Sequence, residues 1–258
     1  MDRGTSRRSK NLIPETPAMR YTGVDGCRGG WCVVTLPGKG PGSLRIEPDF
    51  QSVWQNHRDS SMILVDMPIG LLEDGKNGNP ARACDTLARK LLGKGATSRV
   101  FPVPCRQAVY AEDKAEARRL NLQHLGRSIP AQALKIVPRI REVDECLLHT
   151  DEARKKVFEC HPEIIFKHLN DGNTLPGKRT PEGIRLRNDI LQRYEPRSED
   201  ILNQGAGLSK RYAALDDVLD ALACAMAGLK AKGRFQSLPE DVPLDPKGLP
   251  MQMVYWKP

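Results

Sequence analysis

Residues 213–229 (AALDDVLDALACAMAGL) restrict the fold more than any other segment, because they contain no Lys, Arg, Glu, Ser or Asn. The larger apolar side chains recur at helical spacing, and a helix that is apolar nearly all round must be buried. Its only polar side chains are three aspartates. Asp217 and Asp220 are three residues apart and share a face, whereas Asp216 is expected to cap the helix or face water. The fold must therefore bury this helix together with two carboxylates.

Earlier segments predict the sheet on which such a helix can pack. Apolar runs separated by tight turns predict three antiparallel strands, and a fourth run followed by Pro68 and Gly70 predicts a buried parallel strand. Charged helical segments follow, then another strand-like run, a helix entered at Pro162, a helix, a linker, the long helix and a last strand. The expected strands are 21–25, 31–36, 44–48, 62–65, 155–160 and 251–256, the linker is Pro196–Gly207, and the long helix covers about 209–231.

This order predicts an α/β fold with an RNase H-like mixed sheet, in which three antiparallel strands are followed by parallel strands. Right-handed crossovers place the 62–65 strand beside the first strand and the 155–160 strand beside that one. Helices are expected on both faces. We expect a disordered basic arm at 1–20 and a single domain at 21–258 with a helical insertion at about 71–155.

Two acids at strand ends are the first candidates for a site. Asp25 interrupts an apolar strand just before Gly26, and Asp66 ends the next buried strand. Taken singly, Asp25 is better explained as a turn-capping residue and Asp66 as a solvated strand end. If their strands are adjacent, however, the two carboxylates lie side by side and either share a proton or bind a cation.

The segment FECHPE (158–163) adds three further candidates. Glu159 is expected at the end of its strand, on the same sheet edge as Asp66. Glu163 falls in the first turn of a helix, where capping explains it as well as catalysis does. His161 either orients a carboxylate and moves a proton or is a packed, hydrogen-bonded histidine.

Buried carboxylates without a neighbouring Lys or Arg predict divalent cations. We expect Asp25, Asp66, Asp217 and Asp220 to bind two Mg²⁺ or Mn²⁺ ions, with Glu159 as a further catalytic acid, because hard cations prefer oxygen ligands. Two such ions can activate water and stabilise the leaving oxygen of a phosphodiester.

The net charge of +8 favours polyanionic partners, although ordinary solubility explains the excess of positive charge equally well. Arg28 beside Asp25 is a candidate phosphate contact. Arg99 and Arg106 flank Phe101, which is placed to stack on a base. The alternative is a solvated basic loop with a buried Phe.

Seven scattered cysteines without a CxxC pair indicate a reducing compartment. No run approaches the roughly 20 apolar residues that a membrane-spanning helix needs. We therefore expect a cytoplasmic protein.

Six motifs together resemble one known family. They are VDGCRGGW (24–31), VDMPIGL (65–71), RACDTLARKLLG (82–93), SRVFPVPCR (98–106), ECHPE (159–163) and DDVLDALA (216–223). The chain resembles a domain-of-unknown-function family described as predicted nucleases of RNase H-like fold. Its last helix is also similar to the metal-binding helix of RuvC-type resolvases.

The resemblance implies that Asp25, Asp66, Asp217 and Asp220 bind the metal. RuvC-type enzymes commonly have Glu where Asp66 stands, so either the ion lies closer to the strand or Glu159 supplies the missing reach.

The expected function is metal-dependent phosphodiester hydrolysis of nucleic acid. A non-catalytic nucleic-acid-binding or scaffold protein of the same fold is the alternative. An ATP-binding protein of the actin and sugar-kinase type is the third possibility. It is less favoured because that group needs two copies of the sheet, and 258 residues are too few for both.

Overall fold

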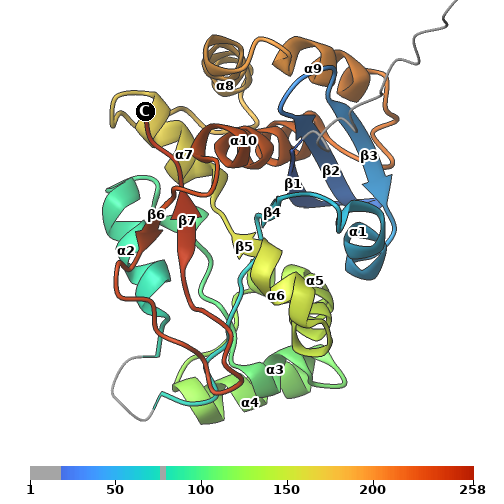
Figure 1. Ribbon diagram of the computed structural model, residues 1–258. Helices are drawn as coiled ribbons and strands as arrows, with labels where there is room; N and C mark the ends of the chain where they lie inside the picture. Colours follow the sequence, from blue (N-terminus) through green and yellow to red (C-terminus); the bar gives the residue numbers. More distant parts are fainter. Residues whose placement is uncertain (1–18, 76–79) are drawn as a thin grey trace, which may run out of the picture.

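A mixed five-stranded sheet forms the centre of the computed structural model, which describes residues 19–75 and 80–258 (Figure 1). The strands lie in the order β3-β2-β1-β4-β5. β1, β2 and β3 pair antiparallel, and β4 and β5 run parallel to β1. The strands are β1 (Arg20–Cys27), β2 (Gly30–Pro37), β3 (Ser43–Glu47), β4 (Met62–Val65) and β5 (Val157–Glu159). This topology confirms the predicted RNase H-like mixed sheet.

Helices cover both faces of the sheet, as expected. α10 (Leu215–Ala231) lies against β1, β2 and β4, and α7 (Pro162–Leu169), α8 (Pro181–Tyr194) and α9 (Ser198–Ala206) pack on α10. On the other face, α1 (Phe50–His57) and α5 (Ala131–His149) pack together over the side chains of Val24, Ile63 and Val65. Because strand side chains alternate, neighbouring residues of one strand belong to different cores.

The expected helical insertion separates β4 from β5. It contains α2 (Ala83–Leu92), a 3₁₀ turn (Thr97–Arg99), α3 (Arg106–Val109), α4 (Lys114–Leu125), α5 and α6 (Asp151–Lys156). α3, α4 and the first half of α5 share a small apolar core of their own. The insertion forms the lower part of the molecule in Figure 1, below the end of β4.

Some expected boundaries were wrong. The predicted linker Pro196–Gly207 contains α9, which buries Ile201, and the long helix begins at Leu215 rather than near 209. β5 begins at Val157 because the residues before it belong to α6. The last strand, β7 (Met253–Tyr255), pairs with β6 (Gln236–Leu238) in a separate two-stranded sheet. The basic arm expected at 1–20 lies outside the described residues except for its last two, and β1 begins at Arg20.

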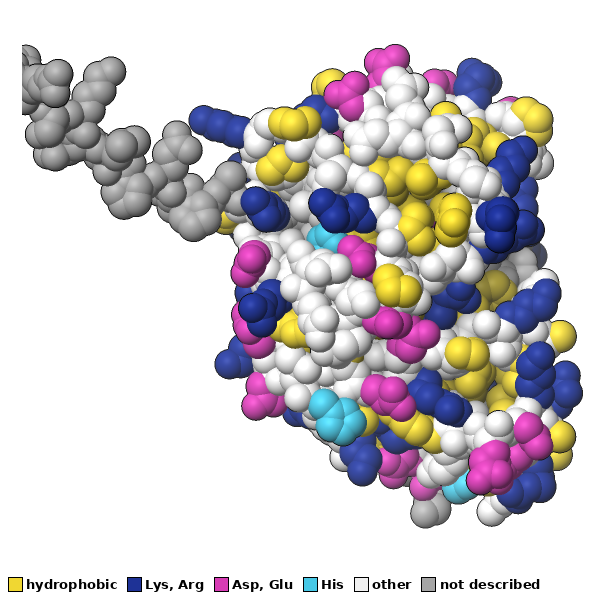
Figure 2. Space-filling model, turned by 90° about the vertical axis from the view of Figure 1, so that its right-hand side faces the viewer, with side chains coloured by type: hydrophobic (Ala, Val, Ile, Leu, Met, Phe, Trp, Pro, Cys, Tyr) yellow, Lys and Arg dark blue, Asp and Glu magenta, His cyan; other side chains and the backbone are white. Residues whose placement is uncertain are grey.

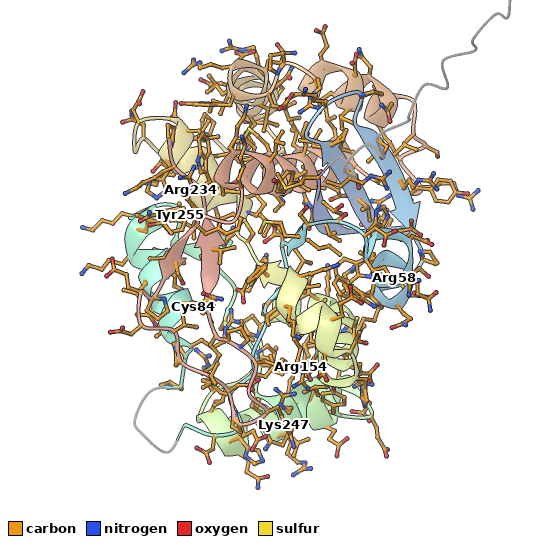
Figure 3. All side chains as sticks on the ribbon, viewed as in Figure 1. Arg58, Cys84, Arg154, Arg234, Lys247 and Tyr255 are labelled. Carbon is orange, nitrogen blue, oxygen red and sulfur yellow. The ribbon has the colours of Figure 1, made fainter. Side chains whose placement is uncertain are left out.

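On the face shown in Figure 2, basic, acidic and apolar side chains are interspersed. Exposed cations lie at widely separated points of the fold, as Arg58, Arg154, Arg234 and Lys247 show in Figure 3. Across the described ranges, no helix combines the length and the apolar character needed to cross a membrane.

Gly23 sets the distance between β1 and α10. A Cβ atom on Gly23 would lie 2.0 Å from the carbonyl oxygen of Ala221 and 2.3 Å from the backbone nitrogen of Ala225. Both obstacles are backbone atoms of α10, so they cannot rotate away as a side chain would. The helix therefore packs directly on the strand at Gly23, two residues before Asp25.

We predict that Gly23→Ala lowers the free energy of unfolding by about 1–3 kcal/mol, because the added methyl group forces α10 away from β1. Urea denaturation followed by circular dichroism measures the loss. Gly38→Ala is the matched control, since its Cβ would meet only the carbonyl oxygen of Met19, at 3.6 Å. Equal stability of the two variants would contradict the close contact.

Candidate metal centre

Three aspartates from separate elements meet at the carboxyl end of β1. Asp25 lies in β1, Asp66 directly follows β4, and Asp220 lies in the second turn of α10. Each offers a carboxylate oxygen, and the three oxygens lie within 4.8 Å of one another. The backbone N–H of Asp66 donates to the carbonyl oxygen of Val24 at 2.9 Å, which continues the parallel pairing and fixes Asp66 beside Asp25.

These carboxyls are held in an environment that disfavours their charge. Burial is the largest cause that raises the pKa of Asp25 well above its usual value, and repulsion from Asp66 and then Asp220 adds to it. Burial likewise raises the pKa of Asp66. It raises the pKa of Asp220 to about 7, with repulsion from Asp66 contributing. The cluster therefore favours a cation that compensates several negative charges at once.

Lys178 supplies part of this compensation, and sequence analysis missed it. Its ammonium donates a hydrogen bond to Oδ2 of Asp220 and lowers the pKa of all three aspartates. The expectation that no Lys or Arg lies near the cluster was therefore wrong. Lys178 comes from the loop before α8, 42 residues from Asp220 in the chain, and nothing in the local pattern points to that contact.

Asp220 nevertheless keeps an unused acceptor. Its side chain is only 2% exposed, and its Oδ1 atom is buried without a hydrogen-bond partner among the described residues. A buried acceptor that is left unpaired costs free energy. An orphaned carboxylate oxygen beside two further carboxylates is the donor set that a divalent cation takes, so these residues fit a metal ion.

Asp216 and Asp217 have roles different from those expected. Asp217 accepts a hydrogen bond from the backbone N–H of Ala214 at 2.9 Å, and so it caps the start of α10. Asp216 is buried and pairs with Arg179. Asp217 also lines the pocket described below, half-buried, but it is not one of the three acids whose oxygens converge.

Glu159 is directed away from the three aspartates. It is the register partner of Val65, so by alternation it shares the face of Val65 and not that of Asp66. Arg82 pairs with both its oxygens at 2.8 Å and also binds Asp85. Glu159 further accepts the N–H of Ile69 at 2.7 Å. The geometry thus assigns Glu159 an ion-pairing role and does not support it as a catalytic acid.

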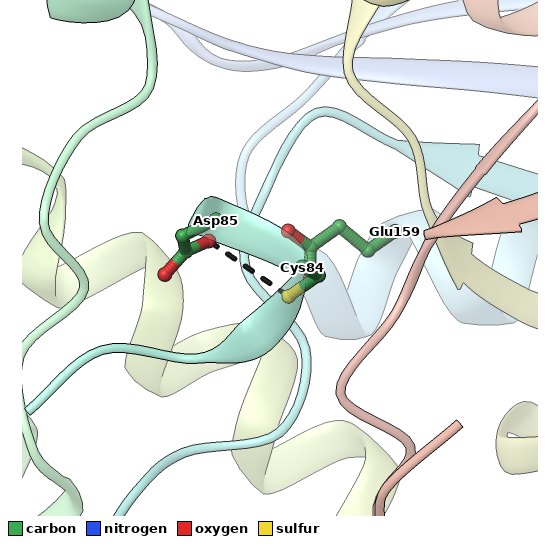
Figure 4. A group of neighbouring side chains, drawn as sticks. All are labelled: Cys84, Asp85 and Glu159. Atoms are coloured by element: carbon green, nitrogen blue, oxygen red, sulfur yellow. Dashed lines mark hydrogen bonds between the residues drawn. The ribbon is translucent and has the colours of Figure 1, made fainter. Parts of the chain in front are cut away.

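A second group of side chains is close enough together to be considered as a metal site: the potential ligand atoms of Cys84, Asp85 and Glu159 lie within 4.8 Å of one another (Figure 4). The guanidinium of Arg82, which is 1% exposed, lies between the two carboxylates and satisfies both. Burial raises the pKa of the Cys84 thiol, so the thiolate that a metal needs is disfavoured. This cluster is therefore an internal ion pair.

A pocket of about 750 Å³ lies over the three aspartates. Its walls come from the start of α10, from α5, from residues 98–103 and from the loop at 177–180. Its lining contains both cations and acids, so it suits a ligand that carries anionic groups and a bound metal together.

The three predicted substrate-binding arginines lie in different surroundings. Arg99 lines the pocket but pairs with Glu163 and donates to the carbonyl oxygen of Leu175. Arg106 is buried between Asp144 and Asp245 and does not line the pocket, so its predicted role is not supported. Arg28 is exposed in the β1–β2 turn, also outside the pocket lining.

His161 and Glu163 are close to the cluster. Nε2 of His161 lies 3.3 Å from the carbonyl oxygen of Arg99, and its buried Nδ1 has no partner in the described part of the chain. His161 lowers the pKa of Asp66. Glu163 is bound by Arg99 and Arg187, so it is a structural acid.

Comparison with known protein families identifies the family of this chain. The family model described as "Protein of unknown function (DUF429)" matches residues 23–244. No curated protein and no solved structure shows significant similarity to the chain. The match confirms the expected membership of a domain-of-unknown-function family, and it covers Asp25, Asp66 and Asp220.

We predict that Arg82→Met lowers the free energy of unfolding by about 3–5 kcal/mol, because it leaves two buried carboxylates without their cation. Arg185→Met is the matched control, since Arg185 forms an exposed pair with Asp189 worth about 1 kcal/mol at most. Urea denaturation compares the two. An Arg82→Met variant as stable as the control would mean that Glu159 is free for another role.

Proposed function

The chain belongs to the DUF429 family of proteins of unknown function, and we propose from its acidic site that it is a divalent-metal-dependent nuclease that hydrolyses phosphodiester bonds. One observation carries the proposal: the carboxylates of Asp25, Asp66 and Asp220 converge from β1, β4 and α10, and an oxygen of Asp220 has no partner among the residues that the structure describes.

Asp25, Asp66 and Asp220 would hold Mg²⁺ or Mn²⁺, with Asp217 beside them at the pocket wall. Mg²⁺ usually takes one or two protein carboxylates per ion, so this set suits the two ions expected from the sequence. Bound ions would supply an activated water and compensate the charge that develops on the leaving oxygen.

The chain itself contributes orientation and charge. The pairing of Asp66 with Val24 fixes one carboxylate, and the contact of α10 with Gly23 fixes another. The ammonium of Lys178 lies beside these acids and lines the pocket, where it can hold a phosphate oxygen. Burial of the acids excludes bulk water and strengthens every charge interaction there.

A non-catalytic nucleic-acid-binding function is the second candidate, and Lys178 is the observation that favours it. Its ammonium already pairs with Asp220, so part of the negative charge is compensated without a metal. In that case the protein would bind nucleic acid without metal-dependent turnover.

We also propose a cytoplasmic location. All seven cysteines are free thiols, as is usual in proteins of reducing compartments.

We predict that the wild-type protein cleaves fluorescently labelled oligonucleotides in Mg²⁺ or Mn²⁺, and that Asp220→Asn lowers the rate by at least about 100-fold through loss of a metal ligand. Asp189→Asn, an exposed acid outside the pocket, is the control with the same charge change. Since burial disfavours the charge of Asp220, the Asn variant should stay folded. Full activity of Asp220→Asn would refute the proposed site.

We further predict that saturating Mn²⁺ raises the Tm of the wild-type protein. A ligand at about 100 times its Kd adds roughly 2.7 kcal/mol, which corresponds to about 5–10 °C for a chain of this size. Differential scanning fluorimetry measures the shift, which Asp189→Asn should keep and Asp220→Asn should lose. A shift of equal size in both variants would place the ion elsewhere.

A further inference from the structure

The acids lie at the floor of a pocket, and this placement restricts what can reach them. Asp220 is 2% exposed and Asp25 is 8% exposed. At about 750 Å³, the pocket falls within the roughly 300–1,000 Å³ typical of sites that enclose a small ligand. A substrate must therefore place a narrow, flexible part of itself inside.

The insertion closes one side of this pocket. The guanidinium of Arg139, on α5, donates a hydrogen bond to the carbonyl oxygen of Cys27, next to the turn after β1. The side chain is so close that a Cβ on Gly26 would lie 2.5 Å from its Cδ. α5 is thus in direct contact with the strand that carries Asp25, and a wide double helix cannot lie flat across that strand.

The same helix offers cations for phosphates. Lys135 and Arg139 are one turn apart on α5 and both line the pocket. Lys135 is exposed and forms no hydrogen bond or ion pair with the rest of the described chain. By contrast, Arg82 and Arg99 are occupied by acids. The wall formed by α5 is therefore where a phosphate backbone finds an unpaired cation.

Phe101 gives the pocket an apolar platform. Its side chain is 36% exposed although Val100 and Val103 on either side are buried. It lines the pocket, and no ring or guanidinium of the described residues stacks on it. An exposed aromatic ring beside cations is the arrangement that binds unpaired bases, because every base has a face that can stack.

We infer that the substrate is a single strand of nucleic acid, with one unpaired base stacked on Phe101 and the adjoining phosphates held by Lys135 and Arg139. This inference rests on the proposed function in assigning the phosphodiester to the three aspartates. It adds that duplex DNA is excluded until its strands are separated.

Binding without cleavage tests the inference. In EDTA, the full-length protein is titrated into a fluorescein-labelled DNA strand of about 12 nucleotides, and separately into the same sequence as a blunt duplex, with fluorescence anisotropy as the readout. We expect the single strand to bind at least about 10-fold more tightly than the duplex. A duplex that binds as tightly, or dTMP that competes as well as the strand, would overturn the inference.

Variants of Phe101 identify the platform. Phe101→Ala should weaken single-strand binding by about 5- to 100-fold, whereas Phe101→Tyr should keep it, because stacking needs only an aromatic ring. Leu122→Ala, which truncates an exposed apolar side chain on α4, is the control. Unchanged affinity in a folded Phe101→Ala variant would contradict the assignment.

Salt dependence identifies the phosphate contacts. Lys135→Gln should reduce the slope of log K against log salt by about 0.7, since one phosphate contact is lost. Lys247→Gln, an exposed lysine outside the pocket (Figure 3), should leave the slope unchanged. Equal slopes in both variants would mean that Lys135 on α5 does not contact a phosphate.

The two proposals fail in different ways. Binding of the single strand through Phe101 without cleavage in Mn²⁺ would refute the nuclease and leave this inference standing. Metal-dependent cleavage that prefers the duplex would refute this inference and leave the nuclease standing.

Discussion

The direct contact between α10 and β1 at Gly23 is the constraint on which the site depends. Gly23 in the strand and the small residues Ala221 and Ala225 in the helix let the two backbones come into direct contact. There is no room between them even for a Cβ atom on Gly23. Asp25 follows Gly23 by two residues and so lies on the same face, and Asp220 precedes Ala221 on the helix. A larger residue at Gly23 would separate the carboxylates as well as the backbones, so core packing and site geometry are fixed together.

Acids in the same pocket are stabilised in two different ways. Glu159 has a complete set of partners in Arg82 and the N–H of Ile69, and it gains nothing from a metal. Asp25, Asp66 and Asp220 share one ammonium, that of Lys178, and one buried oxygen of Asp220 is unpaired within residues 19–75 and 80–258. The difference follows from strand alternation, which sends Glu159 to one face of the sheet and Asp66 to the other. Only the second group retains free capacity for a cation.

The pattern of apolar residues in the sequence predicted those features of the structure that depend on residues close together in the chain. The strand order and the buried final helix followed from apolar runs, and strand adjacency then brought Asp25, Asp66 and Asp220 together. The side of the sheet that Glu159 faces depends on the register of β5, which sequence alone does not reveal. Lys178 could not be found, because a loop residue reaches its partner through tertiary folding. α9 was missed because burial of Ile201, not propensity, holds it in place.

The net positive charge of the chain is a poor guide to its binding surface. It does not show which cations are available to a ligand, because several arginines are paired with buried acids: Arg82, Arg99, Arg106, Arg187 and Arg197. These cations are needed to hold the protein together and cannot also bind a polyanion. Which cations a ligand can contact near the acids depends on where they lie in the fold. Lys135 and Arg139, on α5 of the insertion, line the pocket. The sheet and α10 therefore supply the acids of the pocket, while the insertion places two cations in the same lining.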